Sequence, residues 1–450
     1  MAAVISLLLP IAAWTVLCRR TDTRAHWLGA WAWAAPMAIG SSSVVWWGLM
    51  QLGIESQQGL IAADTGVWLA AIGVVLLRRQ GAPCATFEPR PVSHDHTRWI
   101  LFAGVTMVLG LAAISFAADA AVEPHGDWDA WAIWNLRARF LYRGYPAYWR
   151  DGFSPLLGWS HVDYPLLVPL SVARGWTFAG RESTVVPAVV AALFALGIVV
   201  AAAVSVGRAR GRARGALAGA AILACPTFVK YSSSQCADVP LAFFILATFV
   251  AMFRAFESPP GRSAWLMAGA SAGLAAWTKN EGLLFLVVFV TVAAIGSCGS
   301  GKTAGLKCAG RLLLGALPMI VALMALKALA PGNDLLHAQS AESLVTAFGS
   351  LDRVTTVAAG VGQALWFGGA GAVGVLPIIA AFGVVVGLDR PANPAPIMAL
   401  IAMALLIAGY AGVYALTPHD LEWQMKTSLD RVMLHAFPTL VWSGLMLARK

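Results

Sequence analysis

Charged residues are scarce in this chain. Only 12% of its 450 residues are Asp, Glu, Lys or Arg, whereas ordinary soluble domains carry about 25%. Apolar residues make up 59% of the sequence. So few charges cannot build a normal solvated surface, which excludes a soluble globular protein. The composition predicts an all-α polytopic membrane protein.

Cysteines and internal repeats are also few. The chain has six cysteines, and only Cys236 is expected on the outer side of the membrane, where it has no partner. Structural disulfides are therefore not expected. No internal repeat is evident, which counts against transporter folds that are built from duplicated halves.

Long apolar runs are abundant. A membrane-spanning helix needs roughly 20 mainly apolar residues, and the sequence offers about thirteen such runs on that criterion. They lie near residues 2–18, 27–50, 60–77, 99–118, 183–207, 215–229, 237–253, 263–278, 282–297, 311–330, 368–387, 395–416 and 432–447. We expect a three-span N-terminal module over 1–98 and a membrane catalytic domain over 99–450.

The positive charge follows the loops. A net charge of +9 would suit nucleic-acid binding, but the basic residues lie in every second short loop, as the positive-inside rule expects. These residues are Arg19, Arg20, Arg24, Arg78, Arg79, Arg208, Arg210, Arg212, Arg214, Arg254, Arg262, Lys302, Lys307, Arg390, Arg449 and Lys450. We therefore predict no nucleic-acid partner, a bacterial inner-membrane location and a cytoplasmic C-terminus. The loops that then face the exterior are 51–59, 119–182, 230–236, 279–281, 331–367 and 417–431.

The largest outer loop, 119–182, contains an acidic segment rich in tryptophan. It reads His125-Gly126-Asp127-Trp128-Asp129-Ala130-Trp131-Ala132-Ile133-Trp134. Four residues recur at helical spacing, namely Asp127, Trp131, Trp134 and Ala138. This spacing predicts one aromatic stripe on an amphipathic helix that lies in the membrane interface.

Asp127 and Asp129 are candidate catalytic residues. A carboxylate beside aromatic rings can act as a general base that takes a proton from an attacking hydroxyl. The Asp-x-Asp pattern can also hold a divalent cation, although no cofactor is firmly predicted and no metal ligand is assigned. The simpler alternative is that both carboxylates only complement the dipole at a helix N-terminus.

Asp163 is a further acidic residue of this loop, within His161-Val162-Asp163-Tyr164-Pro165. The proline keeps Tyr164 extended, so Asp163 is expected in a fixed turn. It is either a simple turn cap or a residue that binds the acceptor or orients the base. His161 and Tyr164 are candidate substrate-binding residues.

The outer ends of other spans supply polar side chains. Candidate substrate ligands are Lys230, Arg431 and the Lys279-Asn280-Glu281 interruption, in which Lys279 and Glu281 are singled out. Lysine and arginine stabilise negative charge on phosphate oxygens. The alternative for each basic residue alone is snorkelling to lipid headgroups. The segment Thr417 to Arg431 is expected to cap a site.

Taken together, these stretches resemble bacterial membrane glycosyltransferases of the GT-C superfamily, near the protein O-mannosyltransferase and lipid A aminoarabinose transferase branch. The resemblance rests on Asp127 to Arg139, Asp163 to Leu167, Lys279 to Gly282 and Trp423 to Arg431. It implies inverting transfer of a sugar from a polyprenyl-phosphate donor to a lipid or glycan acceptor. It also implies that Asp129 is the base and that Asp127 is the second candidate for this role. Asp163 matches the second acidic position of the family.

We therefore predict a membrane glycosyltransferase whose active site faces the exterior, in contact with membrane lipids. Trp128, Trp131 and Tyr164 are expected to offer flat surfaces for sugar or prenyl packing. The alternative is a transporter or flippase of a lipid-linked or anionic substrate, which would need essential charges near mid-membrane. Asp64 and Lys327 are the main residues of that kind.

Overall fold

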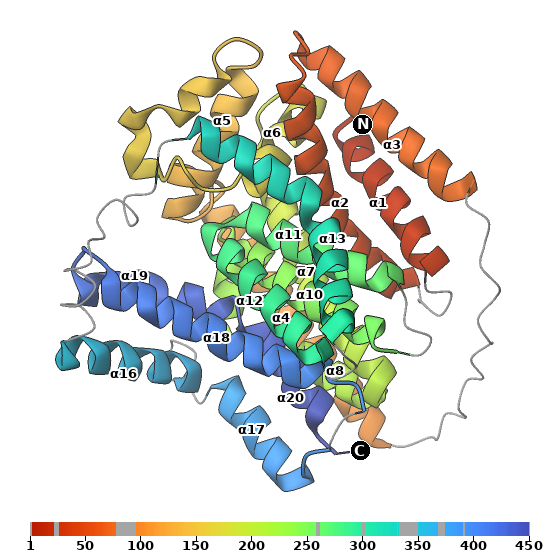
Figure 1. Cartoon of the computed structure of the whole chain (residues 1–450), viewed down its shortest axis with the longest axis vertical. Coiled ribbons are helices and arrows are strands. Elements are labelled where there is room, and N and C mark those ends of the chain that lie inside the picture. The colour runs from red at the N-terminus through yellow and green to blue at the C-terminus, as the bar shows by residue number, and fades with distance from the viewer. Residues whose placement is uncertain are drawn as a thin grey trace.

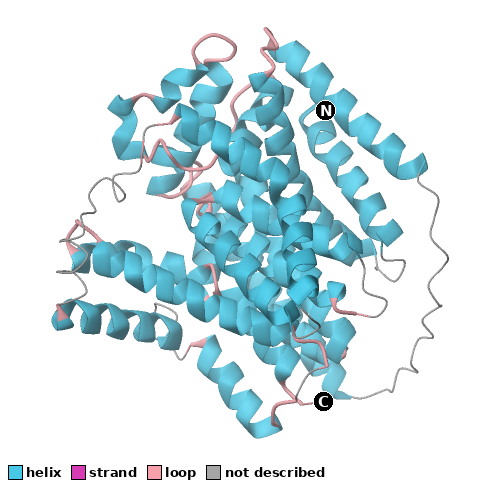
Figure 2. Cartoon of the chain, in the orientation of Figure 1, coloured by secondary structure: helices cyan, strands magenta, loops and turns pink. Residues whose placement is uncertain are grey.

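Helices make up nearly all of the described chain (Figure 2). The computed structural model describes residues 2–21, 27–77, 96–257, 262–298, 302–330, 332, 350–367, 374–389 and 392–449. No strand occurs among these residues, apart from an isolated bridge between Leu388 and Ala448. Arg24, Arg78, Arg79, Cys84, Arg390 and Lys450 lie outside the described ranges.

The long helices follow the predicted apolar runs. They are α1 (Ala2–Thr21), α2 (Trp27–Gln51), α3 (Gln57–Leu77), α4 (His96–Val122), α7 (Val185–Arg210), α10 (Asp238–Ala255), α11 (Arg262–Thr278), α12 (Asn280–Ser297), α13 (Lys302–Leu329) and α18 (Ala395–Leu416). Shorter helices are α5 (Asn135–Arg143), α6 (Leu167–Ala179), α8 (Arg212–Leu223), α9 (Pro226–Ser233), α16 (Leu351–Phe367), α17 (Val375–Val386), α19 (Leu421–Leu434) and α20 (Phe437–Leu447). Figure 1 shows their arrangement.

Seven helices of the described residues are long and apolar enough to cross a membrane. These candidate spans are Gln57–Leu77, Ala103–Val122, Val185–Arg210, Asp238–Ala255, Asn280–Ser297, Thr303–Leu329 and Ala395–Leu416. The all-α, multi-pass membrane fold predicted from the sequence is confirmed. The number of thirteen spans stays a prediction.

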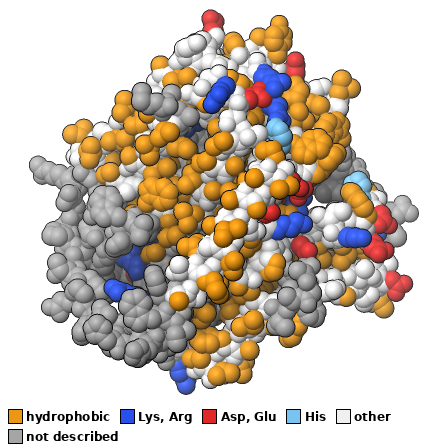
Figure 3. All heavy atoms as spheres, turned by 180° about the vertical axis from the view of Figure 1, so that it is seen from behind, with side chains coloured by type: hydrophobic (Ala, Val, Ile, Leu, Met, Phe, Trp, Pro, Cys, Tyr) orange, Lys and Arg blue, Asp and Glu red, His pale blue; other side chains and the backbone are white. Residues whose placement is uncertain are grey.

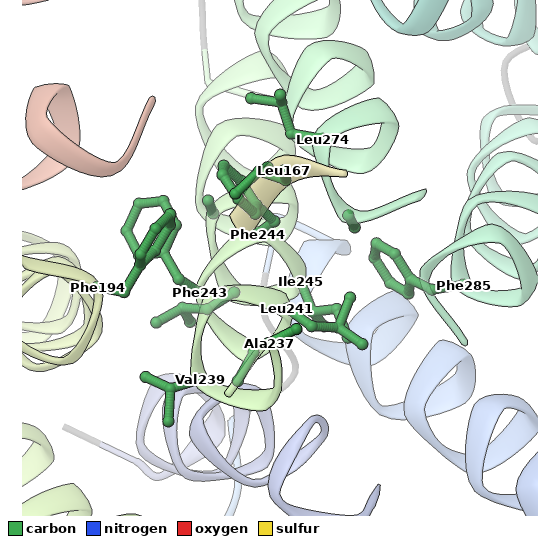
Figure 4. Packing of buried hydrophobic residues seen from close by; sticks show 14 of the residues in the cluster. Leu167, Phe194, Ala237, Val239, Leu241, Phe243, Phe244, Ile245, Leu274 and Phe285 are labelled. Carbon is green, nitrogen blue, oxygen red and sulfur yellow. The ribbon is translucent and has the colours of Figure 1, made fainter. Parts of the chain in front are cut away.

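Helix α10 lies at the centre of the hydrophobic core. Phe243 and Phe244 on this helix are fully buried, and Figure 4 shows them between Phe194 of α7 and Phe285 of α12. Phe194 meets Phe243 and Phe244 edge to face at 5.8 and 5.5 Å between ring centroids, which is a favoured aromatic geometry. This packing fixes the position of the polar residue that begins α10, Asp238.

Glycines allow two neighbouring helices to approach closely. A Cβ atom added at Gly269 of α11 would lie 2.1 Å from the carbonyl oxygen of Leu312 of α13. One added at Gly315 of α13 would lie 2.2 Å from the carbonyl oxygen of Leu266. Small residues at helix contacts are typical of membrane bundles, where close backbone packing replaces the hydrophobic effect.

The N-terminal helices are tied to the loop helix α6 by a buried ion pair. Arg174 of α6 contacts Asp64 of α3 with Nη2 2.5 Å from Oδ2, and its Nη1 donates to the carbonyl oxygen of Ser6 at 2.8 Å. A buried charge needs such partners, because its desolvation is costly. The division at residue 98 stays a prediction.

The prediction of one aromatic stripe on a helix is wrong. Residues Ala130–Trp134 form a π-helical turn, η1, before α5 begins at Asn135. A π turn holds more residues than an α turn, so the 3.6-residue spacing does not carry through it. Trp131 is 41% exposed, whereas Trp134 is 1% exposed and Ala138 is fully buried. The two tryptophans therefore face different surroundings.

Loops predicted to lie on the same side of the membrane do meet. Tyr145 donates to the carbonyl oxygen of Ile54, and Gln57 donates to that of Tyr142 at 2.9 Å. Helix α7 begins at Val185, just after this loop, and is about 39 Å long at 1.5 Å per residue. At its other end, Arg210 pairs with Asp389, with Nη1 2.9 Å from Oδ2. In Figure 3 hydrophobic side chains cover much of the described surface. The acidic side chains lie in the upper and right-hand parts of this view, while basic ones also occur at the lower left and at the bottom.

Candidate active site

Asp238 is the centre of a charged cluster. Its side chain is fully buried, and it begins α10. Oδ1 lies 2.9 Å from Lys279 Nζ and 2.9 Å from His435 Nε2, and Oδ2 lies 3.0 Å from Arg431 Nη2. Because a buried carboxylate is costly unless it is paired, these three side chains hold Asp238 ionised.

Asp238 and His435 were not among the site residues predicted from the sequence. The available signal was a carboxylate at the outer end of an apolar run, since polar groups at membrane depth are often functional. His435 is fully buried between two partners, with Nδ1 3.1 Å from Tyr410 Oη. A carboxylate can only accept, so Nε2 carries the hydrogen, and Nδ1 then accepts from the Tyr410 hydroxyl.

Arg431 links this buried cluster to the acidic loop. Its Nη1 lies 2.6 Å from Asp129 Oδ2, while its Nε and Nη2 contact Asp238. Burial alone lowers the pKa of Arg431, but the carboxylates of Asp238 and Asp129 raise it well above its ordinary value. The Asp129 side chain is 26% exposed, so this end of the cluster is open.

Asp163 forms a second centre next to the first. Asn280 Nδ2 donates to Asp163 Oδ2 at 2.7 Å, and Lys327 Nζ lies 3.3 Å from the same oxygen. Lys327 also donates to the Asp163 carbonyl oxygen at 2.7 Å. The backbone turns here, with Tyr164 N–H donating to the carbonyl oxygen of His161 at 3.0 Å. The predicted turn at Asp163 is thus confirmed.

The Lys279-Asn280-Glu281 interruption connects the two centres. Lys279 contacts Asp238 and also lies 2.9 Å from Glu281 Oε1, while Asn280 contacts Asp163. Successive residues between two helices thereby hold two carboxylates. Glu281 Oε2 is buried, and none of the described residues donates a hydrogen bond to it.

Three rings stack beside Asp163. Tyr164 lies between Trp134, with centroids 5.4 Å apart, and His161, with centroids 4.9 Å apart. Trp134 is buried and His161 is exposed, so the stack runs from the interior to the surface. Arg137 lies nearby in α5, and burial lowers its pKa to about 10, with Asp163 opposing the shift. It stays cationic at neutral pH.

The other aspartate, Asp127, lines an open groove of about 560 Å³. The walls include the exposed rings of Trp128 and Trp131, which meet edge to face at 4.4 Å, and Arg139. Asp127 Oδ1 accepts from the Trp128 N–H at 2.7 Å. Aromatic faces together with a few polar groups are typical of ligand sites.

Lys230 borders the cluster as an exposed cation. Its Nζ lies 5.2 Å from the ring centroid of Tyr231, and Arg431 lies 5.8 Å from the same centroid. No carboxylate of the described chain forms a salt bridge with Lys230. Burial raises the pKa of Tyr231 to about 12, so its ring stays neutral.

The predicted site residues thus gather in three adjoining groups. Arg431, Lys279 and Glu281 join Asp129 around Asp238, His161 and Tyr164 accompany Asp163, and Trp128 and Trp131 accompany Asp127. Within the described ranges, no group of three or more His, Cys, Asp or Glu side chains is arranged to hold a metal ion. The roles of these residues stay predictions.

A comparison with known families gives one match. Residues 163–325 match the model of the dolichyl-phosphate-mannose-protein mannosyltransferase family. This stretch resembles a membrane glycosyltransferase. It contains Asp163, Asp238 and Lys279 but neither Asp129 nor Arg431. No curated protein and no solved structure matches the chain. The match supports membrane glycosyl transfer in general and leaves the donor and acceptor open.

Proposed function

We propose that this protein transfers a sugar from a polyprenyl-phosphate donor to a lipid or glycan acceptor at the outer face of a bacterial inner membrane, with inversion. The observation that carries the proposal is the contact between the partly exposed Asp129 and the buried Arg431–Asp238 pair. It places a carboxylate that can accept a proton beside cations that can bind a phosphate.

The acidic side chains differ in solvent exposure, and this difference suggests different roles for them. The side chains of Asp163 and Asp238 are 7% and 0% exposed, and each is surrounded by donors. Asp129, at 26%, is more open. A general base must reach the hydroxyl whose proton it takes. We therefore assign the base to Asp129, keep Asp127 as the second candidate, and give Asp163 a positioning role through Asn280 and Lys327.

The remaining groups suit the donor. Arg431 and Lys230 are placed for the phosphate, whose developing charge cations stabilise. Lys279 holds Asp238 and Glu281 in place beside Arg431. Trp128, Trp131 and Tyr164 offer rings for the sugar or the prenyl chain.

The test compares membranes that contain wild-type protein, Asp129→Asn or Asp127→Asn, each supplied with radiolabelled polyprenyl-phosphate sugars and endogenous acceptors. We expect label on an acceptor with wild type and a loss of about 100-fold or more with Asp129→Asn, since general-base catalysis typically contributes 10²–10⁴-fold. Transfer by Asp129→Asn at the wild-type rate would exclude Asp129 as the base.

Movement of labelled lipid across the bilayer without transfer would favour a flippase. The two charges that could have served transport are already paired within the described chain. Asp64 is bound by Arg174, and Lys327 contacts Asp163 and Asn280. Neither pairing points to a translocation path, so the transferase is the function that the geometry supports best.

A further inference from the structure

Arg431 divides its guanidinium between two carboxylates in unlike surroundings. Nε and Nη2 lie 3.3 and 3.0 Å from Oδ2 of Asp238, which is fully buried. Nη1 lies 2.6 Å from Oδ2 of Asp129, which is 26% exposed. One side of the guanidinium is thus anchored in the core, while the other side faces an accessible anion.

Within the cluster itself, carboxylates outnumber cations. Asp129, Asp238 and Glu281 supply three carboxylates, whereas Lys279 and Arg431 supply two cations. His435 is neutral when Nε2 donates to Asp238 and Nδ1 accepts from Tyr410. A phosphate that binds Arg431 therefore competes with a carboxylate, whereas Lys230, at the border of the cluster, forms no salt bridge among the described residues.

Asp129 is the most exposed carboxylate of the cluster, and it has a single cationic partner. Asp238 accepts from Lys279, His435 and Arg431, and Glu281 is 22% exposed and paired with the buried Lys279. Within the described chain, Arg431 is the one cation that forms a salt bridge with Asp129. A partly exposed pair is worth little compared with a buried network.

We propose that Asp129 occupies the position of the donor's phosphate and that donor binding releases it. The inference rests on the proposed function and adds to it the order of events at the site. A phosphate oxygen takes Nη1 of Arg431 while Nε and Nη2 stay on Asp238, and the exposed Lys230 adds a second cation. Oδ2 of Asp129 is then released from Arg431 at the moment when the donor is in place.

The released carboxylate completes the reaction. Asp129 takes the proton of the acceptor hydroxyl, whose oxygen forms a bond to the anomeric carbon. The bond from that carbon to the phosphate oxygen breaks, and its electron pair leaves on the prenyl phosphate. Without a donor, the salt bridge to Arg431 holds Oδ2 of Asp129, so this oxygen is not available to an acceptor hydroxyl.

The proposal predicts that removing the catalytic charge strengthens lipid-phosphate binding. The probe is undecaprenyl phosphate, titrated against the detergent-solubilised full-length chain and measured by native mass spectrometry. Loss of one competing, partly exposed ion pair should tighten binding by Asp129→Asn about three- to tenfold over wild type. Undecaprenol, which lacks the phosphate, should bind both proteins equally.

Asp151→Asn is the matched control. It removes the same charge from an exposed residue of the same loop, and Asp151 forms no salt bridge among the described residues. The affinity of this variant should stay within twofold of wild type. Equal or weaker binding by Asp129→Asn, or an equal gain with Asp151→Asn, would overturn the proposed exchange of Asp129 for phosphate at Arg431. Failure of wild type to bind the probe would also reject it, together with the donor class.

The two proposals can fail separately. If Asp129→Asn binds the phosphate more tightly but wild type transfers no sugar, the proposed exchange of Asp129 for phosphate is supported and the proposed sugar transfer is rejected. If sugar transfer requires Asp129 but Asp129→Asn does not bind undecaprenyl phosphate more tightly, the assignment of Asp129 as the base is supported and the proposed exchange is rejected.

Discussion

At the scale of single residues, Asp238 holds the site together although it is too buried to react. It joins side chains from three segments, Lys279 before α12, Arg431 in α19 and His435 after it. Removing one member of a buried ionic network leaves the others without compensation. The cluster is therefore expected to depend on Asp238 more than on any exposed carboxylate.

We predict that Asp238→Asn lowers the free energy of unfolding by about 3 kcal/mol or more, the cost of breaking a buried ion pair. The measurement is thermal unfolding of the purified protein in detergent. Glu422→Gln is the control, because Glu422 is exposed in the first turn of α19 and should unfold within about 0.5 kcal/mol of wild type. An unfolding temperature for Asp238→Asn equal to that of the control would contradict the role of Asp238.

At the scale of elements, the close contact of α11 with α12 positions Lys279 and Asn280 between the two carboxylate centres. The chain reverses there with almost no loop, since α11 ends at Thr278 and α12 begins at Asn280. Gly282 makes this possible, because a Cβ atom at this position would lie 1.8 Å from the Ala275 carbonyl oxygen. That separation is far below any real contact, so a side chain would force the helices apart.

Gly282→Ala is accordingly expected to destabilise the protein by about 1–3 kcal/mol, the usual cost of overpacking. Because the helix shift displaces Lys279 and Asn280, it should also reduce sugar transfer. Gly310→Ala in α13 is the matched control, since nothing lies within 4 Å of its added Cβ. An alanine there should be neutral or stabilise the helix by up to about 1 kcal/mol. Similar unfolding temperatures for the two variants would show that the contact tolerates a side chain.

At the scale of the whole molecule, the polar loops lie at the two ends of a helical bundle. The loops that hold Asp129, Lys279 and Arg431 meet at one end. Arg210 and Arg214 contact Asp389 and the C-terminal carbonyl groups at the other. This arrangement agrees with the orientation predicted from the basic residues, which stays a proposal.

Labelling with a membrane-impermeant maleimide tests the orientation. Glu123 is exposed beside the Asp127 groove, and Cys298 is exposed at the opposite end of α12 from Lys279. We expect Glu123→Cys to react on intact cells and the wild-type protein to react only after lysis. Labelling of wild type on intact cells would place Cys298 outside and reverse the predicted orientation.

The sequence by itself determined the kind of protein and much of its helical layout. Apolar runs became helices because a chain in lipid must satisfy its backbone hydrogen bonds within each segment. The alternating basic loops assigned the segments that contain Asp129, Lys279 and Arg431 to one side, and these three residues do meet in the structure. The segments around Asp129, Asp163, Lys279 and Arg431 could therefore be chosen from their composition alone.

Only the tertiary structure decided how these residues pair. Partners such as Asp129 and Arg431 are about 300 residues apart, and nothing local encodes their contact. Asp238 and His435 were missed because each is a lone polar residue beside an apolar run, and the charge that compensates it comes from other helices. The helical periodicity of the sequence did not predict the π turn at Ala130–Trp134. The additional residue in a π turn changes which face of the helix the later side chains occupy. Packing, which depends on every helix at once, thus determined which carboxylate is buried and which is open.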